Sequence, residues 1–368
     1  MNWNYFIESN ETLLFSNAQV GSCSTLLTFD IAESALEGVW AIEIVSQSTL
    51  LNGKQQVSFE ISADKKLAIP LNEFNDQVHV LKITMERKGQ SHECFLALIP
   101  VCESPKVCIV VGSPRSGTTV VGNMVQRALL TKAHGEAHLA ELFNNLVAAA
   151  ESHLTESLAA NNKGTMVWEM PSTLLKAQLV KQLRDLYIMY YGNEAIVDKT
   201  PGLPMLRALP LLMLAFPNAK VVYCQRRGLE NVASRMRKFP KAKFEGHCQQ
   251  WAQTVQLWQR TKNEVSKLLN NRRWFFEVEQ FELATSPDNV ISSLGEFLGA
   301  AKPSVNRMFK YQEKNSPQVT SGKPSDVTSF QTINWSSEQK TLFLEKCASV
   351  MDSQGYSLDE SYYKKEAQ

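Results

Sequence analysis

Residues Val107–Thr119, VCIVVGSPRSGTT, form an apolar strand that runs into a glycine-bounded loop and then a helix. The spacing nearly fits the nucleotide-binding pattern G-x-x-x-x-G-K-[ST], but Thr118 stands where that pattern has lysine. The lysine would reach the outer phosphates of a nucleoside triphosphate, and the next hydroxyl would hold Mg²⁺. Here the cation is Arg115, inside the loop, and the N–H groups at the helix N-terminus can still bind an anion. The loop therefore predicts a site for a small, doubly charged 5′ group of a nucleotide.

A second element about a hundred residues later could bind another anion. In Phe216–Arg235, FPNAKVVYCQRRGLENVASR, an apolar strand leads directly to Arg226 and then to a helix that carries Ser234. A helix that begins near Gly228 would add the favourable field of its N-terminus for a phosphate. Lys238 follows one turn after Ser234, on the same helical face. Surface charge and an ordinary helical serine are the alternative interpretation.

These two elements, in this order, resemble the nucleotide motifs of the sulfotransferases that use 3′-phosphoadenosine 5′-phosphosulfate (PAPS). The layout is most similar to the tyrosylprotein and bacterial sulfotransferases, over roughly Val107 to Tyr356. In the 5′-phosphosulfate loop, the resemblance implies cofactor-binding roles for Pro114, Arg115, Ser116, Gly117, Thr118 and Thr119. Arg226 and Ser234 fall on the arginine and serine of the 3′-phosphate segment, and Lys238 on a basic residue of the tyrosylprotein enzymes.

The same resemblance implies catalytic roles for further residues beside Arg115. Lys199, in VDKTP, has the Lys-x-Pro context of the tyrosylprotein enzymes, in which the lysine stabilises charge on the bridging oxygen of the leaving group. Glu136, in HGEAHLAEL, lies as far from the loop as their catalytic glutamate. The cytosolic members use histidine as the base, so His138 competes with Glu136, and His134 is a weaker competitor. The structural alternatives are a surface lysine before a turn and a glutamate that only favours its helix N-terminus.

Two other segments bear on nucleotide binding. Asn315–Pro324, NSPQVTSGKP, resembles, with altered spacing, the stretch that closes over PAPS in the tyrosylprotein enzymes. Ser316 and Lys323 would be the corresponding cofactor-binding residues, and a flexible loop is the alternative. Val278 stands where those enzymes carry a tyrosine of the adenine site, so other residues must contact adenine. Those enzymes are also anchored in a membrane, and since no apolar run here predicts such an anchor, a protein-tyrosine acceptor is not carried over.

The composition is that of an ordinary soluble globular protein and excludes some partners. The 368 residues are 44% hydrophobic and 20% charged, with a formal net charge of +1. Because the charges balance, no bulk attraction to nucleic acid or to an anionic membrane is expected. The seven cysteines lack metal-ligand spacing, so free thiols and no metal site are predicted. No apolar run has the length of a membrane span and Met1–Glu11 is not leader-like, which predicts a cytoplasmic location.

The elements that position these residues divide the chain in two. Residues 1–103 are predicted to form a small all-β sandwich, because apolar and polar residues alternate at strand spacing. The alternating apolar sets are Trp40, Ile42 and Ile44, then Val57, Phe59 and Ile61, then Leu81, Ile83 and Met85, before a turn at Lys88-Gly89-Gln90 and a strand at Glu93–Pro100. This part carries no catalytic cluster, and residues 104–368 are predicted to form the domain that carries the site.

From Pro105 onward, strands alternate with helices. This pattern predicts an α/β fold, a P-loop-like parallel sheet with helices on both faces. Strands are expected at Val107–Val111, Ala195–Asp198, Ala219–Cys224 and Arg273–Val278, and helices at Thr173–Tyr191 and Leu203–Ala215. Ligands of such sheets bind at the carboxyl ends of the strands. Because the anion loop, the Asp198-Lys199 pair and Arg226 all follow strands, one shared site is predicted.

The function that these features predict is transfer of the sulfuryl group from PAPS to a hydroxyl of a small-molecule or glycan acceptor, with adenosine 3′,5′-bisphosphate (PAP) as the product. Glu136 or His138 would take the proton of the hydroxyl, and Lys199 would steady the departing oxygen. The sequence does not identify the acceptor. A P-loop kinase and a non-catalytic nucleotide-binding protein stay open as alternatives. The N-terminal β region would either dock a protein partner or shield an apolar face of the other part.

Overall fold

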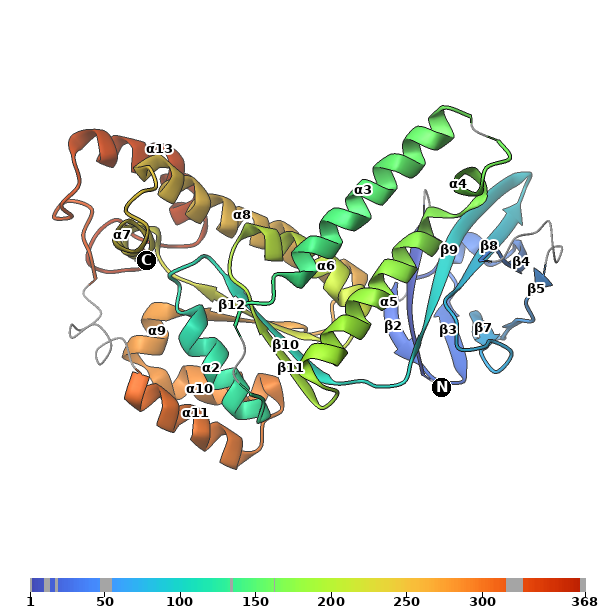
Figure 1. The fold of residues 1–368 in the computed structure, drawn as a ribbon, viewed down its shortest axis with the longest axis horizontal. Coiled ribbons are helices and arrows are strands. Elements are labelled where there is room, and N and C mark those ends of the chain that lie inside the picture. The colour runs from blue at the N-terminus through green and yellow to red at the C-terminus, as the bar shows by residue number, and fades with distance from the viewer. Residues whose placement is uncertain are drawn as a thin grey trace.

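The computed structural model of the chain describes residues 2–9, 14–16, 19–46, 55–132, 135–161, 163–315 and 327–364. Within these ranges an antiparallel β region is followed by an α/β region built on a parallel sheet (Figure 1). The β region lies at one end of the molecule, and the C-terminal helices lie at the other. None of the helices in these ranges is long and apolar enough to cross a membrane.

The N-terminal region consists of two antiparallel sheets that face each other. The larger sheet has the strand order β2 (Val20–Cys23), β1 (Asn2–Ser9), β9 (Gln90–Val101), β8 (His79–Arg87), β4 (Val39–Ile44) and β5 (Gln55–Gln56). The smaller sheet has the order β3 (Leu26–Asp30), β7 (Lys66–Pro70) and β6 (Glu60–Ile61), and a short 3-10 helix, η1, spans Glu33–Ala35. Phe29 of β3, Ile69 of β7 and Ile42 of β4 are fully buried in one core between the sheets. The predicted sandwich is therefore observed.

Most of the predicted strand pattern in this region is confirmed. On β8, Leu81, Ile83 and Met85 all face the sandwich core, as their alternation predicts. Lys88 and Gly89 form the predicted turn, with φ angles of 50° and 76°. The strand after that turn is longer than predicted, since β9 begins at Gln90 and ends at Val101.

One predicted strand is wrong. The alternation of Val57, Phe59 and Ile61 suggests a single strand, but β5 ends and β6 begins on either side of residues 57–59. β5 pairs with β4 in the larger sheet, whereas β6 pairs with β7 in the smaller one. The chain crosses between the sheets here, so Val57 is buried while Ile61 is 45% exposed. The alternation thus comes from two short pairings rather than from one pleated segment.

The larger sheet is buried on both faces. Successive side chains of a strand point to opposite sides. Trp3 of β1 and Leu96 of β9 face the sandwich core, while Phe6 of β1 and Ala97 of β9 belong to a second core shared with the helices of the α/β region. The N-terminal region therefore covers an apolar face of those helices, which is one of the two roles predicted for it.

The α/β region is built on a four-stranded parallel sheet, and its helices cover both faces, as predicted (Figure 1). The strand order is β11 (Ala195–Lys199), β10 (Lys106–Gly112), β12 (Lys220–Gln225) and β13 (Phe275–Glu279). One face packs on α3 (Leu139–Ala159), α5 (Ser172–Tyr191), α6 (Leu203–Ala215) and α8 (Phe244–Leu268). The other packs on α2 (Thr118–Leu129), α9 (Gln280–Thr285), α10 (Pro287–Leu298) and α11 (Lys302–Asn315). The other helices of the described ranges are α4 (Met166–Glu169), α7 (Gly228–Lys238) and α13 (Ser337–Ser353).

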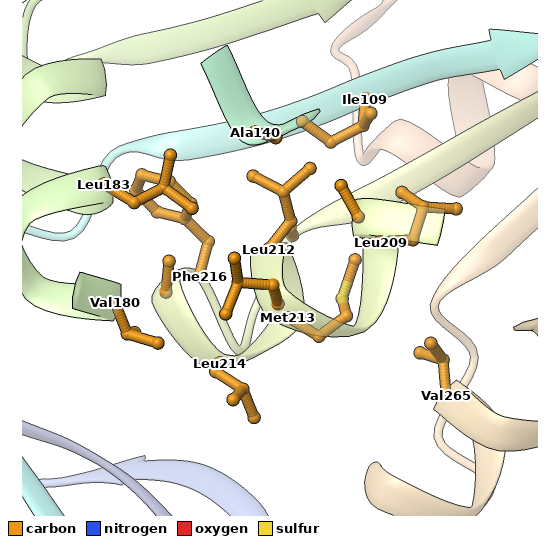
Figure 2. Packing of buried hydrophobic residues seen from close by; sticks show 14 of the residues in the cluster. Ile109, Ala140, Val180, Leu183, Leu209, Leu212, Met213, Leu214, Phe216 and Val265 are labelled. Atoms are coloured by element: carbon orange, nitrogen blue, oxygen red, sulfur yellow. The ribbon is translucent and has the colours of Figure 1, made fainter. Parts of the chain in front are cut away.

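Helix α6 lies in the middle of the largest core. Its Leu209 and Leu212 are fully buried beside Ile109 of β10 and Leu183 of α5 (Figure 2). The helix is apolar on nearly all sides, which agrees with the predicted buried helix over the same residues.

Polar contacts join the two regions around that core. The side-chain amide of Asn4 donates a hydrogen bond to the carbonyl oxygen of Ala215 at 3.0 Å. Glu8 accepts from Thr173 Oγ1 and from Lys176 Nζ, each at 2.6 Å. Because β9 and β10 are separated by only a few residues and their regions share a core, the division into domains 1–103 and 104–368 stays a prediction.

The chain after α13 is fastened to the sheet by a buried carboxyl group. Glu279, the last residue of β13, is 4% exposed and accepts hydrogen bonds from the Tyr356 hydroxyl and, at 2.6 Å, from the Tyr362 hydroxyl. Burial raises the pKa of Glu279 to about 7, and the two tyrosine hydrogen bonds act against that shift.

Replacing Glu279 by glutamine should remove a pH dependence of stability. Since the folded-state pKa of about 7 lies above the ordinary 4.5, the contribution of Glu279 is fully present below pH 4.5 and is lost as pH rises through about 7. Between these values the free energy of unfolding should fall by up to about 1.4 kcal/mol per pH unit. Urea unfolding across this range measures the effect, with the exposed Glu296→Gln as the control. Parallel pH profiles of wild type and Glu279→Gln would contradict the assignment.

Candidate active site

The loop after β10 is shaped by residues with unusual backbone angles. Gly112 has φ 145°, and a Cβ atom there would lie 2.1 Å from the Cys224 carbonyl oxygen of β12. Gly117, with φ 85°, is the N-cap of α2, and no side chain caps that helix. Between them, Arg115 has φ 78°, a conformation that residues other than glycine rarely adopt. The N-terminal N–H groups of α2 are therefore directed at the loop, where they can bind an anion.

An asparagine without a predicted role holds this loop from behind. Asn231 of α7 is fully buried. Its Nδ2 donates to Ser116 Oγ at 3.0 Å and to the Pro114 carbonyl oxygen at 3.2 Å, and its Oδ1 accepts from Ser113 Oγ at 3.4 Å. The signal in the sequence is spacing, because Asn231 lies one helical turn before Ser234 and so shares its face.

The two predicted anion motifs are in contact. Because β12 is the neighbour of β10, α7 begins beside the loop. Arg115 Nε donates to Ser234 Oγ at 3.1 Å, and Arg226 Nη1 donates to the Arg115 carbonyl oxygen at 3.2 Å. Ser234 is only 5% exposed. Of the other predicted loop residues, Ser116 and Thr118 are buried, whereas Thr119 faces solvent at the start of α2.

One donor atom of Arg226, its Nε, has no hydrogen-bond partner among the described residues. Burial lowers the pKa of Arg226. Its backbone is fixed, because Trp251 Nε1 donates to the Arg226 carbonyl oxygen at 3.0 Å. An enclosed cationic donor without a partner costs free energy, and a bound anion would remove that cost.

The adjacent arginine, Arg227, is structural instead. It is fully buried, its Nε donates to Glu230 Oε2 at 2.9 Å, and its Nη1 donates to the Asp359 carbonyl oxygen at 2.7 Å. These contacts tie the C-terminal segment to α7. Lys238, predicted for the same anion site, is exposed at the end of α7 and makes no hydrogen bond or ion pair with the described residues. The two other predicted cofactor-binding residues, Ser316 and Lys323, lie outside the described ranges.

On the opposite side of the loop, the predicted catalytic side chains meet. Lys199 ends β11, the other neighbour of β10, and its Nζ donates to Glu136 Oε1 at 2.9 Å. Glu136 Oε2 lies 3.2 Å from His138 Nε2. The Lys199 side chain is 16% exposed and that of Glu136 is 38% exposed, so solvent reaches the carboxylate more easily than the amine. His134 lies outside the described ranges.

His138 is held between two carboxylates. Its Nδ1 lies 2.9 Å from Glu141 Oε2, and its Nε2 is the atom near Glu136. Carboxylates only accept hydrogen bonds, so the imidazolium form, which donates from both nitrogens, fits both contacts. The hydrogen bond to Glu141 raises the pKa of His138, and Glu136 adds to the shift. A protonated histidine cannot take another proton, so the geometry favours Glu136 over His138 as a base.

A glycine on α2 makes room for Lys199. A Cβ atom at Gly122 would lie 2.8 Å from Lys199 Cγ and 3.1 Å from Lys199 Cβ. The stem of the lysine therefore packs against α2 at a position that has no side chain. A spacing argument could not reveal this, because the two residues are far apart in sequence.

Other predicted features of the site can be placed. Val278 is buried in the core between the sheet and the α2–α10 side, so it does not reach the loop. Gln280, two residues on, does approach it, because its Cγ would lie 3.4 Å from a Cβ atom at Gly117.

All seven cysteines are free, as predicted. Within the described ranges, no group of three or more His, Cys, Asp or Glu side chains is arranged to hold a metal ion.

Comparison with known proteins gives relatives of this chain. A protein of Aquifex aeolicus (strain VF5), described as an uncharacterized protein, is 23% identical over 329 residues, which is 85% of this chain. The chain spans only 39% of the length of that relative.

Three solved structures are also similar. A sulfotransferase domain from the curacin biosynthetic pathway is 17% identical, with 70% of this chain and 99% of the other covered and a TM-score of 0.42. Sulfotransferase STF9 from Mycobacterium avium is 14% identical, with coverage of 69% and 78% and a TM-score of 0.41. A mouse sulfotransferase in complex with PAP is 12% identical, with coverage of 68% and 89% and a TM-score of 0.37.

A family model described as the sulfotransferase family matches residues 108–303, more than half of the chain. The matched range begins within β10, and it contains the anion loop, the Lys199–Glu136 contact and the Arg226–Ser234 segment. On that match, the chain belongs to the sulfotransferase family.

Proposed function

We propose that the protein transfers the sulfuryl group of PAPS to a hydroxyl group of an acceptor. The observation that carries this proposal is the strand order β11–β10–β12. It sets the Lys199–Glu136 pair on one side of the anion loop and the Arg226–Ser234 segment on the other. A nucleotide with a reactive 5′ group and a second phosphate on its ribose needs charged residues on both sides of such a loop.

The residues present fit PAPS. The uncapped N-terminus of α2 and the loop amides would take the 5′-phosphosulfate. Arg226, with its unpartnered Nε, and Ser234 would take the 3′-phosphate. Arg115 borders both positions, because it belongs to the loop while its guanidinium lies against Ser234. Lys238 could join the 3′-phosphate site from the exposed end of α7.

The catalytic side chains would act on the two ends of the transferred group. Glu136 would accept the proton of the acceptor hydroxyl while the hydroxyl oxygen forms its bond to sulfur. Lys199 would donate to the phosphate oxygen as the bond between that oxygen and sulfur breaks, and PAP leaves. In the structure Lys199 donates to Glu136 itself, at 2.9 Å. Lys199 would therefore have to exchange this contact for the leaving oxygen, which would free the carboxylate to act as a base.

Nucleotide preference tests the proposal against a kinase. PAP should raise the midpoint of thermal unfolding, because it supplies an anion to the enclosed Arg226, whereas ATP with Mg²⁺ should raise it much less. Transfer of label from radiolabelled PAPS to a panel of phenols, sugars and aliphatic alcohols then tests the activity directly. Stabilisation by ATP with Mg²⁺ alone would refute the proposed donor.

Glu136→Gln should lower kcat by about 10²–10⁴-fold, because the amide cannot accept the proton of the hydroxyl. The dissociation constant for PAP should stay unchanged, since Glu136 lies on the side of the loop away from Arg226. The rate is measured with whichever acceptor of the panel is sulfated. Glu156→Gln, the same change at the far end of α3, is the control. Unchanged kcat in Glu136→Gln would move the role of the base to His138.

Arg226→Ala should weaken PAP and PAPS binding by roughly 10-fold to 150-fold, the usual range for a hydrogen bond to a charged group. Binding of adenosine 5′-phosphosulfate, which lacks the 3′-phosphate, should change far less. Isothermal titration measures both, and the exposed Arg260→Ala serves as the control for loss of a positive charge. An equal loss for both nucleotides would remove Arg226 from the 3′-phosphate site.

A further inference from the structure

A buried chain of hydrogen bonds lies under the Lys199–Glu136 contact. Asp198 and Thr200, on either side of Lys199, are both fully buried. Asp198 Oδ2 accepts from the Tyr187 hydroxyl and Asp198 Oδ1 from Thr200 Oγ1, each at 2.6 Å. Thr200 Oγ1 in turn accepts from the Ala137 backbone N–H at 3.1 Å.

These hydrogen bonds matter because Ala137, Asp198 and Thr200, which make them, are next in sequence to the proposed catalytic residues. Ala137 lies between Glu136 and His138, and Lys199 lies between Asp198 and Thr200. Both partners of the 2.9 Å contact are thus one peptide bond away from the partly buried hydrogen bond between Ala137 and Thr200. The Thr200–Ala137 bond links segments 63 residues apart at the point where their catalytic side chains meet.

The hydrogen bonds from Ala137 through Thr200 to Asp198 all run in one direction, from donor to acceptor. A threonine hydroxyl has one hydrogen, so when Thr200 donates it to Asp198, the oxygen presents lone pairs to the Ala137 N–H. Each Asp198 oxygen accepts one hydrogen bond, from Tyr187 and from Thr200, an arrangement that fits the ionised form, which can only accept. Burial raises the pKa of Asp198, while hydrogen bonds from Thr200 and Tyr187, and nearby Ala137 N–H and His138, act against the shift.

The segment that Thr200 holds enters α3 without a side-chain cap. α3 begins at Leu139, and its N-cap is His138, which has φ 51° and makes no side-chain capping bond. The ring of His138 contacts carboxylates instead. The hydrogen bond that the Ala137 N–H donates to Thr200 Oγ1 therefore constrains the residues that enter the helix in place of a side-chain cap.

We propose that Asp198 and Thr200 are positioning residues, which orient the Glu136 segment against Lys199 for proton transfer. This inference rests on the proposed function for its catalytic meaning. Tyr187, fully buried on α5, is the third member and fixes the second oxygen of Asp198.

Thr200→Val and Thr200→Ser form the matched test. Valine has nearly the same shape but no hydroxyl, so the Ala137 N–H loses the Thr200 oxygen and keeps only the nearby Asp198 carboxylate, and the segment shifts. We expect kcat to fall about 10-fold to 100-fold, the effect of a small misplacement of reacting groups. Affinity for PAP should not change, and Thr200→Ser, which restores the oxygen, should recover most of the rate.

A second readout needs no acceptor. In wild type, the Ala137 amide should be protected from hydrogen exchange although it precedes the helix, and NMR titration should give His138 a pKa above its ordinary value. In Thr200→Val, the protection should be lost and the pKa of His138 should move toward its ordinary value, as the ring leaves Glu141. Thr200→Ser should retain both properties.

The outcomes separate this inference from the proposed function. If wild type transfers no sulfate from PAPS, the function is refuted, while the NMR experiment still decides whether Thr200 holds the segment. If wild type is active and Thr200→Val has the same kcat and the same His138 pKa, the positioning role is overturned. Should Thr200→Val not fold, an unprotected Ala137 amide in wild type overturns it as well.

Discussion

The arrangement of the site depends on one constraint, which is that β10 has a parallel neighbour on each side. Parallel strands end at the same edge of a sheet, so the three loops after β11, β10 and β12 must converge there. The approach is so close that the Cβ of any residue but glycine at position 112 would collide with the carbonyl oxygen of Cys224. The sheet itself then brings together the anion loop, Lys199 and Arg226, and the connecting segments have little freedom.

The surrounding polar groups stabilise this convergence from three directions. Asn231 fixes the loop from α7, and Thr200 fixes the Glu136 segment from the end of β11. Arg227, buried with Glu230, fastens the C-terminal segment to α7, which carries Ser234. Buried polar groups of this kind are costly unless every donor and acceptor is satisfied. By contrast, Arg226 Nε has no hydrogen-bond partner among the described residues, and the same holds for Arg235 Nε and Nη1 on α7.

The parallel sheet and its helices could be predicted because strands buried on both faces appear in sequence as short apolar runs, as in Val107–Val111. The contact between Glu136 and Lys199 could be predicted only in part, because the sequence indicates both residues as candidates but not the distance between them. The spacing of Asn231 from Ser234 indicates a shared helical face, but neither Asn231 nor Thr200 could be given its contacts, because a polar residue in sequence does not reveal which groups it will meet. The expected strand at Val57–Ile61 failed for a related reason, since alternation does not reveal which sheet a segment joins.

The burial of the larger N-terminal sheet on both faces has a consequence for synthesis of the chain. Phe6, Val80 and Ala97 belong to a core that also needs α6, which ends at Ala215, more than a hundred residues after β9. At translation rates of about 5 to 20 residues per second, this apolar face stays uncovered for roughly 5 to 20 seconds until α6 has been synthesised. During that interval the nascent sheet offers a surface on which chaperones, or other nascent chains, can bind.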